Sequence, residues 1–302
     1  MDRQALRAKL EGVVAFPITP FNADLSLDLD GLKRNLEPLL DHPFCAIVAA
    51  GGTGEMYSLN ADEYAAVVKT TVEIVGGQTP VIAAAGFNYA IAPHMAQTAA
   101  ALGVDGILAF PPYYPNAGFE ALKAYYQAIG SATELGMLIY SRDWAVFTPD
   151  QVDAMADIEQ LIAWKDGQAD IRRYQMIMNQ VGDKLRWIGG AGDDIVPAYY
   201  ATGIRTYTSS ISNVDPALSI HLHEWAANGD TAKLQAAMER FVIPLYNFRR
   251  RGKGYEVSVM KRMMDLLGLV GGPVRPPLQD VKECDQAELQ RLTALIPQVS
   301  AS

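Results

Sequence analysis

Residues 161–167 read LIAWKDG, an apolar run of strand length that ends in one lysine and a short acidic turn. Seven other short apolar runs recur along the chain, with longer segments between them. Most of the eight are nearly continuous, which is typical of parallel strands covered on both faces. The expected strands are 12–19, 46–50, 81–85, 106–110, 136–140, 161–165, 185–189 and 204–208.

The segments between these runs have helical spacing. Leu32, Leu36 and Leu39 form one apolar stripe, and Tyr64 and Val68 belong to another. Eight strand-helix units of this kind close most naturally into a (β/α)8 TIM barrel. The alternative is a doubly wound open sheet, but the chain has no obvious switch-point motif to support it.

The chain after the eighth run has no strand signal and reads as helices. The expected helices are 216–227, 231–250, 255–267 and 286–295, and the Gly- and Pro-rich segment 268–277 separates the last two. These are too many helices for one final barrel layer. We therefore expect a barrel over residues 1–228 and a C-terminal helical extension over 229–302 that packs on it.

The composition is that of a folded globular protein, with 302 residues of which 50% are hydrophobic and 20% charged. The formal net charge is −9, which repels polyphosphate backbones. One basic run, Arg249, Arg250, Arg251 and Lys253, is short, and we interpret it as a solvated linker or a subunit contact. Nucleic acid is therefore not an expected partner.

Cys45 and Cys284 lie too far apart in sequence for a dense disulfide framework or a short-spaced zinc site. We expect them to be reduced thiols in a cytoplasmic protein. The first residues, MDRQALRAKLEG, lack an apolar signal core, and no apolar stretch is long enough to span a bilayer. Neither export nor a membrane partner is expected.

In barrels of this type the site forms where the strands end. The polar residues expected there are Thr53, Glu55, Tyr113, Tyr114, Tyr140, Ser141, Arg142 and Lys165, with the runs GGAGDD (189–194) and TSSISN (208–213) after the last two strands. No histidine is among them, which removes the simple forms of a Ser-His-Asp triad. His221 and His223 are two apart on an expected helix and do not share a face, so no metal site is predicted.

The turn GGTGE (51–55) lacks the third glycine of a dinucleotide fingerprint, and the chain has no GxxxxGK phosphate loop. Two interpretations stay open from the turn alone. It is either a tight strand-helix turn or a set of exposed backbone N–H groups that hold a carboxylate.

Lys165 is the strongest single feature. It follows Leu161, Ile162 and Trp164, and desolvation by such neighbours lowers the pKa of a lysine. A neutral amine can attack a carbonyl to form an imine, and the iminium then acts as an electron sink. The alternative is a structural lysine that pairs with Asp166.

Tyr140 ends the neighbouring strand, so its phenol could reach atoms bound to Lys165. Imine formation moves protons on and off the carbonyl oxygen, which a positioned phenol can do. The alternative for Tyr140 is an interior aromatic residue with a satisfied hydroxyl.

These residues resemble a known family, the dihydrodipicolinate synthase and N-acetylneuraminate lyase family of Schiff-base (β/α)8 barrels. The resemblance runs from GVVAFPITPF (12–21) to GPVRPPL (272–278) and includes GGTGE. It implies that Lys165 is the imine lysine, Tyr140 the proton-relay tyrosine, and Tyr114 the tyrosine that reaches across a subunit interface. It places Thr53 in the carboxylate-binding turn. It also implies a homotetramer or homodimer.

Two departures from the family pattern are informative. Gly52 stands where a hydroxyl residue usually precedes Thr53, and the asparagine that usually follows the strand-five tyrosine is replaced, giving YSRDWAVF (140–147). The double glycine and the Arg142-Asp143 pair are similar to one branch of the family, the 5-dehydro-4-deoxyglucarate dehydratases. The missing hydroxyl argues against an ordinary pyruvate condensation and against a catalytic role for Tyr114.

This resemblance implies a six-carbon sugar diacid as substrate and its conversion to 2,5-dioxopentanoate, CO2 and water. The imine on Lys165 serves both steps, so no metal or organic cofactor is expected. The carboxylate beside the ketone would rest on the N–H groups of Gly52 and Thr53. The candidate donors for the distal carboxylate are Arg142, Ser209, Ser210 and Asn213, although Arg142 has Asp143 as an alternative partner.

Two alternatives to this function stay open. One is an aldolase or condensing enzyme of the same family, which uses the same imine to cleave or form a carbon-carbon bond. The other is a barrel without catalytic activity that binds a sugar acid.

Overall fold

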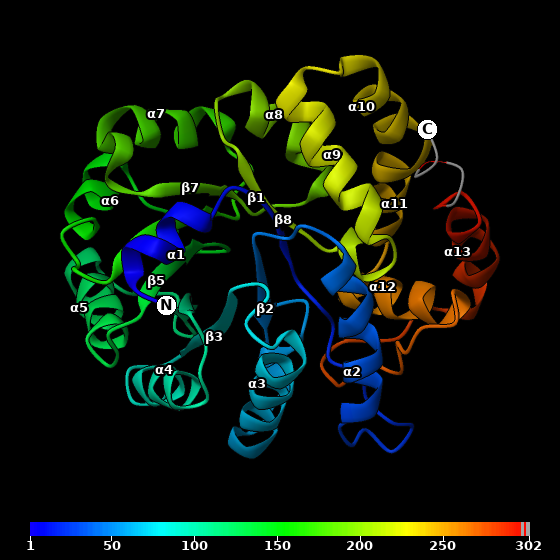
Figure 1. Cartoon of the computed structure of the whole chain (residues 1–302), viewed down its shortest axis with the longest axis horizontal. Helices are drawn as coiled ribbons and strands as arrows, with labels where there is room; N and C mark the ends of the chain where they lie inside the picture. The colour runs from blue at the N-terminus through cyan, green and yellow to red at the C-terminus, as the bar shows by residue number, and fades with distance from the viewer. Residues whose placement is uncertain (297–298, 300–302) are drawn as a thin grey trace.

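The computed structural model describes residues 1–296 and 299, and at its centre eight parallel strands close into a barrel (Figure 1). Each strand pairs with the next, and the eighth pairs with the first. The predicted (β/α)8 barrel is confirmed. The strands are β1 (Gly12–Ala15), β2 (Ala46–Ala49), β3 (Val81–Phe87), β4 (Gly106–Pro112), β5 (Gly136–Ser141), β6 (Leu161–Asp166), β7 (Arg186–Gly189) and β8 (Thr206–Ser209).

Four strands are shorter than predicted: β1 by four residues, and β2, β7 and β8 by one residue each. β1 ends at Ala15 because Pro17 and Pro20 follow, and proline has no N–H to donate to a neighbouring strand. β8 begins at Thr206, two residues after the predicted start. All four differences lie at strand ends, so they leave the order and the direction of the strands unchanged.

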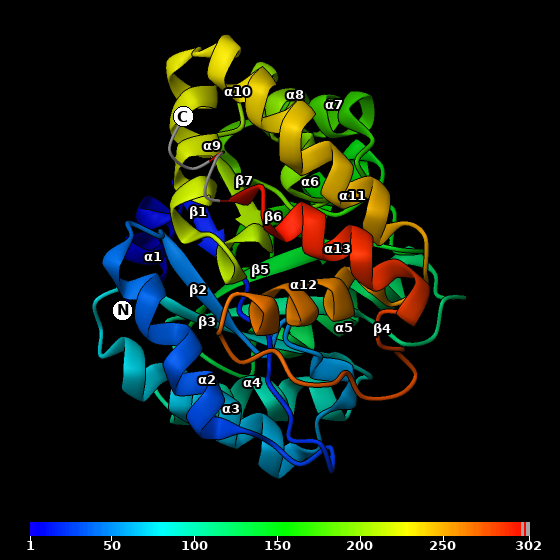
Figure 2. The ribbon, with the colours of Figure 1, turned by 90° about the vertical axis from the view of Figure 1, so that its right-hand side faces the viewer.

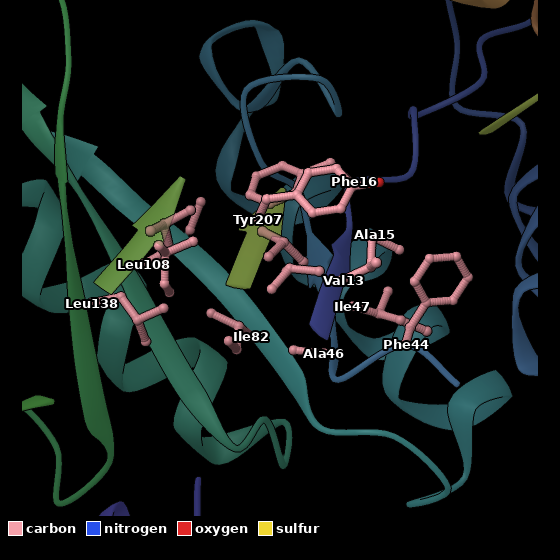
Figure 3. Packing of buried hydrophobic residues seen from close by; sticks show 14 of the residues in the cluster. Val13, Ala15, Phe16, Phe44, Ala46, Ile47, Ile82, Leu108, Leu138 and Tyr207 are labelled. Carbon is pink, nitrogen blue, oxygen red and sulfur yellow. The ribbon is translucent and has the colours of Figure 1, made fainter. Parts of the chain in front are cut away.

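Most of the strands are apolar along their length, as is typical of parallel strands covered on both faces. Val13, Ile47 and Ile82 have no exposed surface, and Figure 3 shows them within the cluster that fills and surrounds the barrel. Burying one such side chain stabilises the fold by about 1.5–3 kcal/mol. This cluster is the rigid base on which the strand ends are held.

The barrel helices follow the strands and form the outer ring seen in Figure 1. They are α2 (Leu29–Leu36), α3 (Ala61–Val75), α4 (Ile91–Ala101), α5 (Phe119–Gly130), α6 (Pro149–Met155), α7 (Ile171–Val181), α8 (Val196–Ala201) and α9 (Pro216–Asn228). A first helix, α1 (Arg3–Lys9), contacts β5 and β6 and buries Leu6 against Gly106 and Gly136, the residues that begin β4 and β5. It thereby covers the end of the barrel away from the strand C-termini. None of the described helices is both long and apolar enough to cross a bilayer.

The C-terminal part of the chain is helical, as predicted. It consists of α10 (Thr231–Ala237), a π-helical segment (Met238–Val242), α11 (Ile243–Arg249), α12 (Tyr255–Leu266) and α13 (Gln286–Thr293). The wide π turn lies just before Pro244, which cannot donate to the carbonyl of Arg240. In Figure 2, α12 and α13 lie in front of the barrel strands. The division of the chain at residue 228 stays a prediction.

Candidate active site

A cavity of about 360 Å³ lies at the C-terminal ends of the strands. Its lining comes from the ends of strands on several sides of the barrel and from the C-terminal helices. The lining residues are Phe16, Gly52, Thr53, Tyr57, Tyr140, Arg142, Asp143, Lys165, Gly167, Gly190, Ala191, Gly192, Thr208, Ser209, Ser210, Tyr246, Arg249, Glu256, Val257 and Leu278. Seven of the nine residues predicted for the site are among them, and the two exceptions are Tyr114 and Asn213.

Lys165 is the next-to-last residue of β6, and it is buried, with 3% of its surface exposed. Its Nζ donates a hydrogen bond to the carbonyl oxygen of Gly190 at 3.2 Å. Gly190 must be a glycine here, because a Cβ at this position would lie 2.5 Å from the Cγ of Lys165. Burial lowers the pKa of Lys165 well below its ordinary value, and the positive charge of Arg142 lowers it further, while Asp166 opposes this shift.

The ion pair considered as an alternative for Lys165 does not form: among residues 1–296 and 299, no carboxylate pairs with it. The oxygens of Asp166 instead accept hydrogen bonds from the hydroxyl of Tyr199 at 2.7 Å and from the amides of Gln168 and Ala169 at 3.0 and 3.2 Å. Burial raises the pKa of Asp166, and these hydrogen bonds lower it. The amine of Lys165 therefore lies in a buried site where, within residues 1–296 and 299, no ion pair holds it in the charged form.

Tyr140 lies beside Lys165 because the two residues are partners in the pairing of β5 with β6. The Nζ of Lys165 is 3.1 Å from the centroid of the Tyr140 ring. The Tyr140 hydroxyl donates to the carbonyl oxygen of Gly190 at 3.1 Å, so the phenol and the amine share one acceptor. Burial raises the pKa of Tyr140, which keeps the phenol protonated and able to donate.

The turn after β2 presents Gly52 and Thr53 to the cavity. The turn is closed by hydrogen bonds from the amide of Glu55 to the carbonyl of Gly52 and from the amide of Met56 to the carbonyl of Gly51, both at 3.2 Å. Neither the N–H of Gly52 nor that of Thr53 donates to another residue in the described part of the chain. The geometry thus favours the interpretation in which these two groups bind an anion.

Glu55 fastens this turn to the C-terminal helices. Its backbone has a φ of 54°, and its carboxylate is fully buried. Lys261 of α12 forms an ion pair with it at 2.6 Å, and the amide of Arg275 donates to its other oxygen at 3.1 Å. Arg275 also forms an ion pair with Glu63 of α3 at 2.6 Å. Burial lowers the pKa of Lys261, and Glu55 opposes that shift.

Arg142 follows β5 and has two kinds of contact. Its Nε pairs with Asp143 at 2.6 Å, which is the alternative considered from the sequence. Its guanidinium also lies over the rings of Tyr140 and Phe110, at 5.3 and 5.8 Å from their centroids. A Cβ on Gly52 would lie 3.3 Å from Nη1 of Arg142. Arg142 therefore lies beside the Gly52 turn, on the side where the carboxylate next to the ketone is expected.

Two predicted residues lie outside the cavity lining. Asn213 is a structural residue: its Oδ1 accepts from the amide of Ile18 at 2.9 Å, and its Nδ2 donates to the carbonyls of Phe16 and Ser210, each at 2.9 Å. The prediction that Asn213 binds the distal carboxylate is not supported, because its amide is already satisfied. Tyr114 is 62% exposed and lies in a separate hollow with Tyr89 and other residues of the β3 and β4 loops.

Ser209 and Ser210 line the cavity but have partners within the protein. The hydroxyl of Ser209 donates to Asp193 and contacts the hydroxyl of Ser219. Ser210 donates from its amide and its hydroxyl to Asp193, each at 3.2 Å, and its hydroxyl accepts from Arg249 at 2.9 Å. Asp193 is fully buried and thus organises the end of β8.

The wall formed by the C-terminal helices was not predicted from the sequence. Tyr246 and Arg249 come from α11, and Glu256 comes from α12. The interpretation of the basic run as solvated or as a subunit contact is wrong for Arg249, which faces the cavity. Its neighbour Arg250 fits a solvated residue, because its side chain is 71% exposed and pairs with Asp194 at 3.5 Å. The one feature of the sequence that could have indicated Arg249 as a residue of the cavity was a basic run in an otherwise acidic chain.

The fold and the cavity define a (β/α)8 barrel with a buried amine at the end of its sixth strand. The chain belongs to the dihydrodipicolinate synthetase family, whose family model matches residues 9–295. The resemblance inferred from GGTGE, Tyr140 and Lys165 is thereby confirmed at the level of the family.

Curated relatives and a solved structure agree with this assignment. The chain is 36% identical to a probable 5-dehydro-4-deoxyglucarate dehydratase of Bradyrhizobium sp. (strain ORS 278), over 100% of this chain and 97% of the relative. It is 38% identical to a protein of the same name from Rhodococcus opacus (strain B4), over 96% and 95% of the two chains. The crystal structure of dihydrodipicolinate synthase from Oceanobacillus iheyensis superposes with a TM-score of 0.93 at 28% identity, covering 98% of this chain and 100% of that one.

Proposed function

We propose that this protein is a Schiff-base-forming dehydratase and decarboxylase that converts 5-dehydro-4-deoxy-D-glucarate to 2,5-dioxopentanoate, CO2 and water. The observation that carries the proposal is the carbonyl of Gly190, which accepts from both the amine of Lys165 and the phenol of Tyr140. When the amine of Lys165 attacks a ketone at this position, the phenol of Tyr140 is close enough to protonate the ketone oxygen, which leaves as water. The names of the curated relatives support the choice of substrate.

The first step joins the substrate to the enzyme. The neutral amine of Lys165 attacks the ketone carbon, the phenol of Tyr140 protonates the departing oxygen, and water is lost as the iminium forms. The carboxylate next to the ketone rests on the N–H groups of Gly52 and Thr53, with Arg142 beside them. Burial favours this step because it keeps the amine uncharged.

The iminium then drives two eliminations. The CH2 group next to it loses a proton, and the following carbon loses its hydroxyl as water, which leaves a carbon-carbon double bond conjugated with the iminium. The distal carboxylate leaves as CO2, and the electrons of its bond to carbon move along the conjugated chain to nitrogen. Reprotonation and hydrolysis release 2,5-dioxopentanoate and return the amine. The water consumed in hydrolysis equals the water released in imine formation, so one CO2 and one water leave per substrate.

The test is to incubate the protein with 5-dehydro-4-deoxy-D-glucarate and to measure CO2 and 2,5-dioxopentanoate. Release of one CO2 for each substrate consumed is the expected result. Pyruvate without CO2 would instead identify an aldolase that uses the same imine. Reduction with borohydride in the presence of a 2-oxo acid checks the covalent step, and the absence of any adduct by mass spectrometry would favour a barrel that only binds sugar acids.

Gly52 is expected to matter because it leaves room for Arg142. In Gly52→Ser the new side chain begins 3.3 Å from Nη1 of Arg142 and 3.7 Å from the Phe110 ring, so the guanidinium must move. We expect the KM for the diacid to rise about tenfold, because a misplaced charged donor loses much of its interaction with a carboxylate. Gly118→Ala is the matched control, since a Cβ there meets no atom within 4 Å. Equal kinetics for the two variants would show that the space at Gly52 has no such role.

We also propose that copies of this chain associate, as the family resemblance implies. Tyr89, Tyr113 and Tyr114 are 67%, 85% and 62% exposed, and such grouped aromatic side chains are typical of contact surfaces. Sedimentation equilibrium measures the association directly, and a monomer at all concentrations would contradict it.

A further inference from the structure

We infer that Arg249, a residue of the C-terminal helices, binds the distal carboxylate of the substrate, and that Ser210 and Asp193 position it. This inference rests on the proposed function and deepens it, since it assigns the residue that selects a diacid over a sugar acid with one carboxylate.

Arg249 is held at the cavity wall by contacts that leave part of its guanidinium available. Nη1 donates to the hydroxyl of Ser210 at 2.9 Å, and Nη2 donates to the backbone carbonyl of Glu256 at 3.0 Å. The guanidinium also lies 4.5 Å from the centroid of the Tyr246 ring. A guanidinium has five N–H groups, and these contacts use two of them.

The charge of Arg249 is not neutralised by a carboxylate of the protein. Within residues 1–296 and 299, no ion pair includes Arg249, whereas its neighbours Arg250 and Arg251 pair with Asp194 and Glu288. The chain is acidic overall, with a formal net charge of −9, yet this arginine lines a cavity without an ion pair. Its positive charge is therefore available to bind an anionic ligand. Glu256 also lines the cavity, and its backbone carbonyl accepts from Arg249, but the two residues form no ion pair in the described part of the chain.

The position of Arg249 is set by a hydrogen-bonded group built on Asp193. One oxygen of Asp193 accepts from the hydroxyl of Tyr246 at 2.7 Å and from the amide and the hydroxyl of Ser210 at 3.2 Å. Because the Ser210 hydroxyl has a single hydrogen and directs it to Asp193, its oxygen is oriented to accept from Arg249. Ser210 is therefore a positioning residue in this arrangement rather than a donor to the substrate.

The cavity thus holds two arginines attached to different parts of its wall. Arg142 lies beside the Gly52 turn after β2, and Arg249 lies beside Ser210 after β8. Lys165 lines the same cavity. A ligand with a ketone and one carboxylate uses the amine and the Gly52 turn, and only a ligand with a second carboxylate at its far end uses Arg249. The arrangement accordingly fits a dicarboxylate.

The test compares a diacid with a monoacid in the wild type and in Arg249→Gln. The two probes are 5-dehydro-4-deoxy-D-glucarate and the six-carbon 2-oxo-3-deoxy sugar acid that has a hydroxymethyl group at its far end. The readout is the concentration of each probe that gives half-maximal borohydride adduct. We expect Arg249→Gln to raise this concentration about 10- to 100-fold for the diacid and to leave it unchanged for the monoacid, because only the diacid loses a charge-assisted hydrogen bond.

Two further variants complete the design. Arg250→Gln is the matched control, because it removes an adjacent arginine that is largely exposed and lies outside the cavity lining, and it should leave both values unchanged. Arg249→Lys keeps the charge and should recover part of the diacid affinity. Equal effects of Arg249→Gln on the two probes, or equal effects of the two glutamine variants on the diacid, would overturn the inference.

Failure of the proposed reaction can be told apart from failure of this inference. If the wild type forms the adduct with the diacid but releases no CO2, the dehydratase assignment is wrong, while the comparison of the two probes still reports on Arg249. If CO2 is released and Arg249→Gln does not distinguish the probes, the reaction stands and the role of Arg249 is wrong.

Discussion

Replacing Lys165 by methionine is expected to abolish the borohydride adduct and all measurable turnover. Methionine preserves the length and much of the volume of the side chain but has no nucleophile, so neither the imine nor the eliminations that depend on it can form. The loss should approach the roughly 10⁶-fold or larger acceleration that enzymes provide. Mass spectrometry of the reduced protein and the CO2 assay measure the two effects, and an adduct in the variant would mean that another amine reacts.

The same variant should be at least as stable as the wild type. The folded state lowers the pKa of Lys165, so the unfolded chain binds the proton more tightly and the lysine destabilises the fold below its ordinary pKa. This penalty grows as the pH falls from the ordinary lysine value towards the lowered one, and it vanishes above the ordinary value. The free energy of unfolding of Lys165→Met, measured in urea, should therefore exceed that of the wild type most clearly at the lower pH. A free energy of unfolding below that of the wild type at the lower pH would contradict this account.

Replacing Lys261 by methionine is expected to destabilise the protein by about 3–5 kcal/mol, because it leaves the carboxylate of Glu55 buried without a cation. The two side chains are 1% and 0% exposed and lie 2.6 Å apart. Urea unfolding measures the loss. The double variant with Glu55→Gln should recover part of it, since the uncompensated charge is then removed as well.

Lys33→Met provides the control for this prediction. Lys33 also forms an ion pair, with Asp30 at 2.9 Å, but its side chain is 44% exposed and that of Asp30 is 86% exposed. Water screens such a pair, so its loss should cost no more than about 1 kcal/mol. If Lys261→Met cost no more than Lys33→Met, the buried pair would not be what fastens the turn of Gly52 and Thr53.

The barrel was predictable from the sequence because its signals are local. A parallel strand covered on both faces needs a continuous apolar run, and residues 161–164 show this directly. Lys165 and Tyr140 were predictable for the same reason: each lies at the C-terminal end of its own strand, and the topology brings neighbouring strand ends together.

The rest of the site depends on contacts between distant parts of the chain. Asn213 was expected to face the substrate, but its partners include Ile18 and Phe16, and no local pattern indicates such contacts. Arg249 was interpreted as part of a solvated linker or a subunit contact. Its hydrogen bond to Ser210 depends on how α11 packs on the barrel, and the local sequence does not indicate that packing. Glu55 was read only as part of a turn, since its cation comes from α12.

The C-terminal helices also set an order in time for a chain that is still being synthesised. The ribosome completes all eight strands, and with them the amine of Lys165, before it adds Arg249, Lys261 and Arg275. Until those residues are made and have folded back, the turn of Gly52 has no cation for Glu55, and the cavity lacks one wall. A nascent chain therefore contains Lys165, the proposed nucleophile, before it contains Arg249, the residue proposed to bind the distal carboxylate.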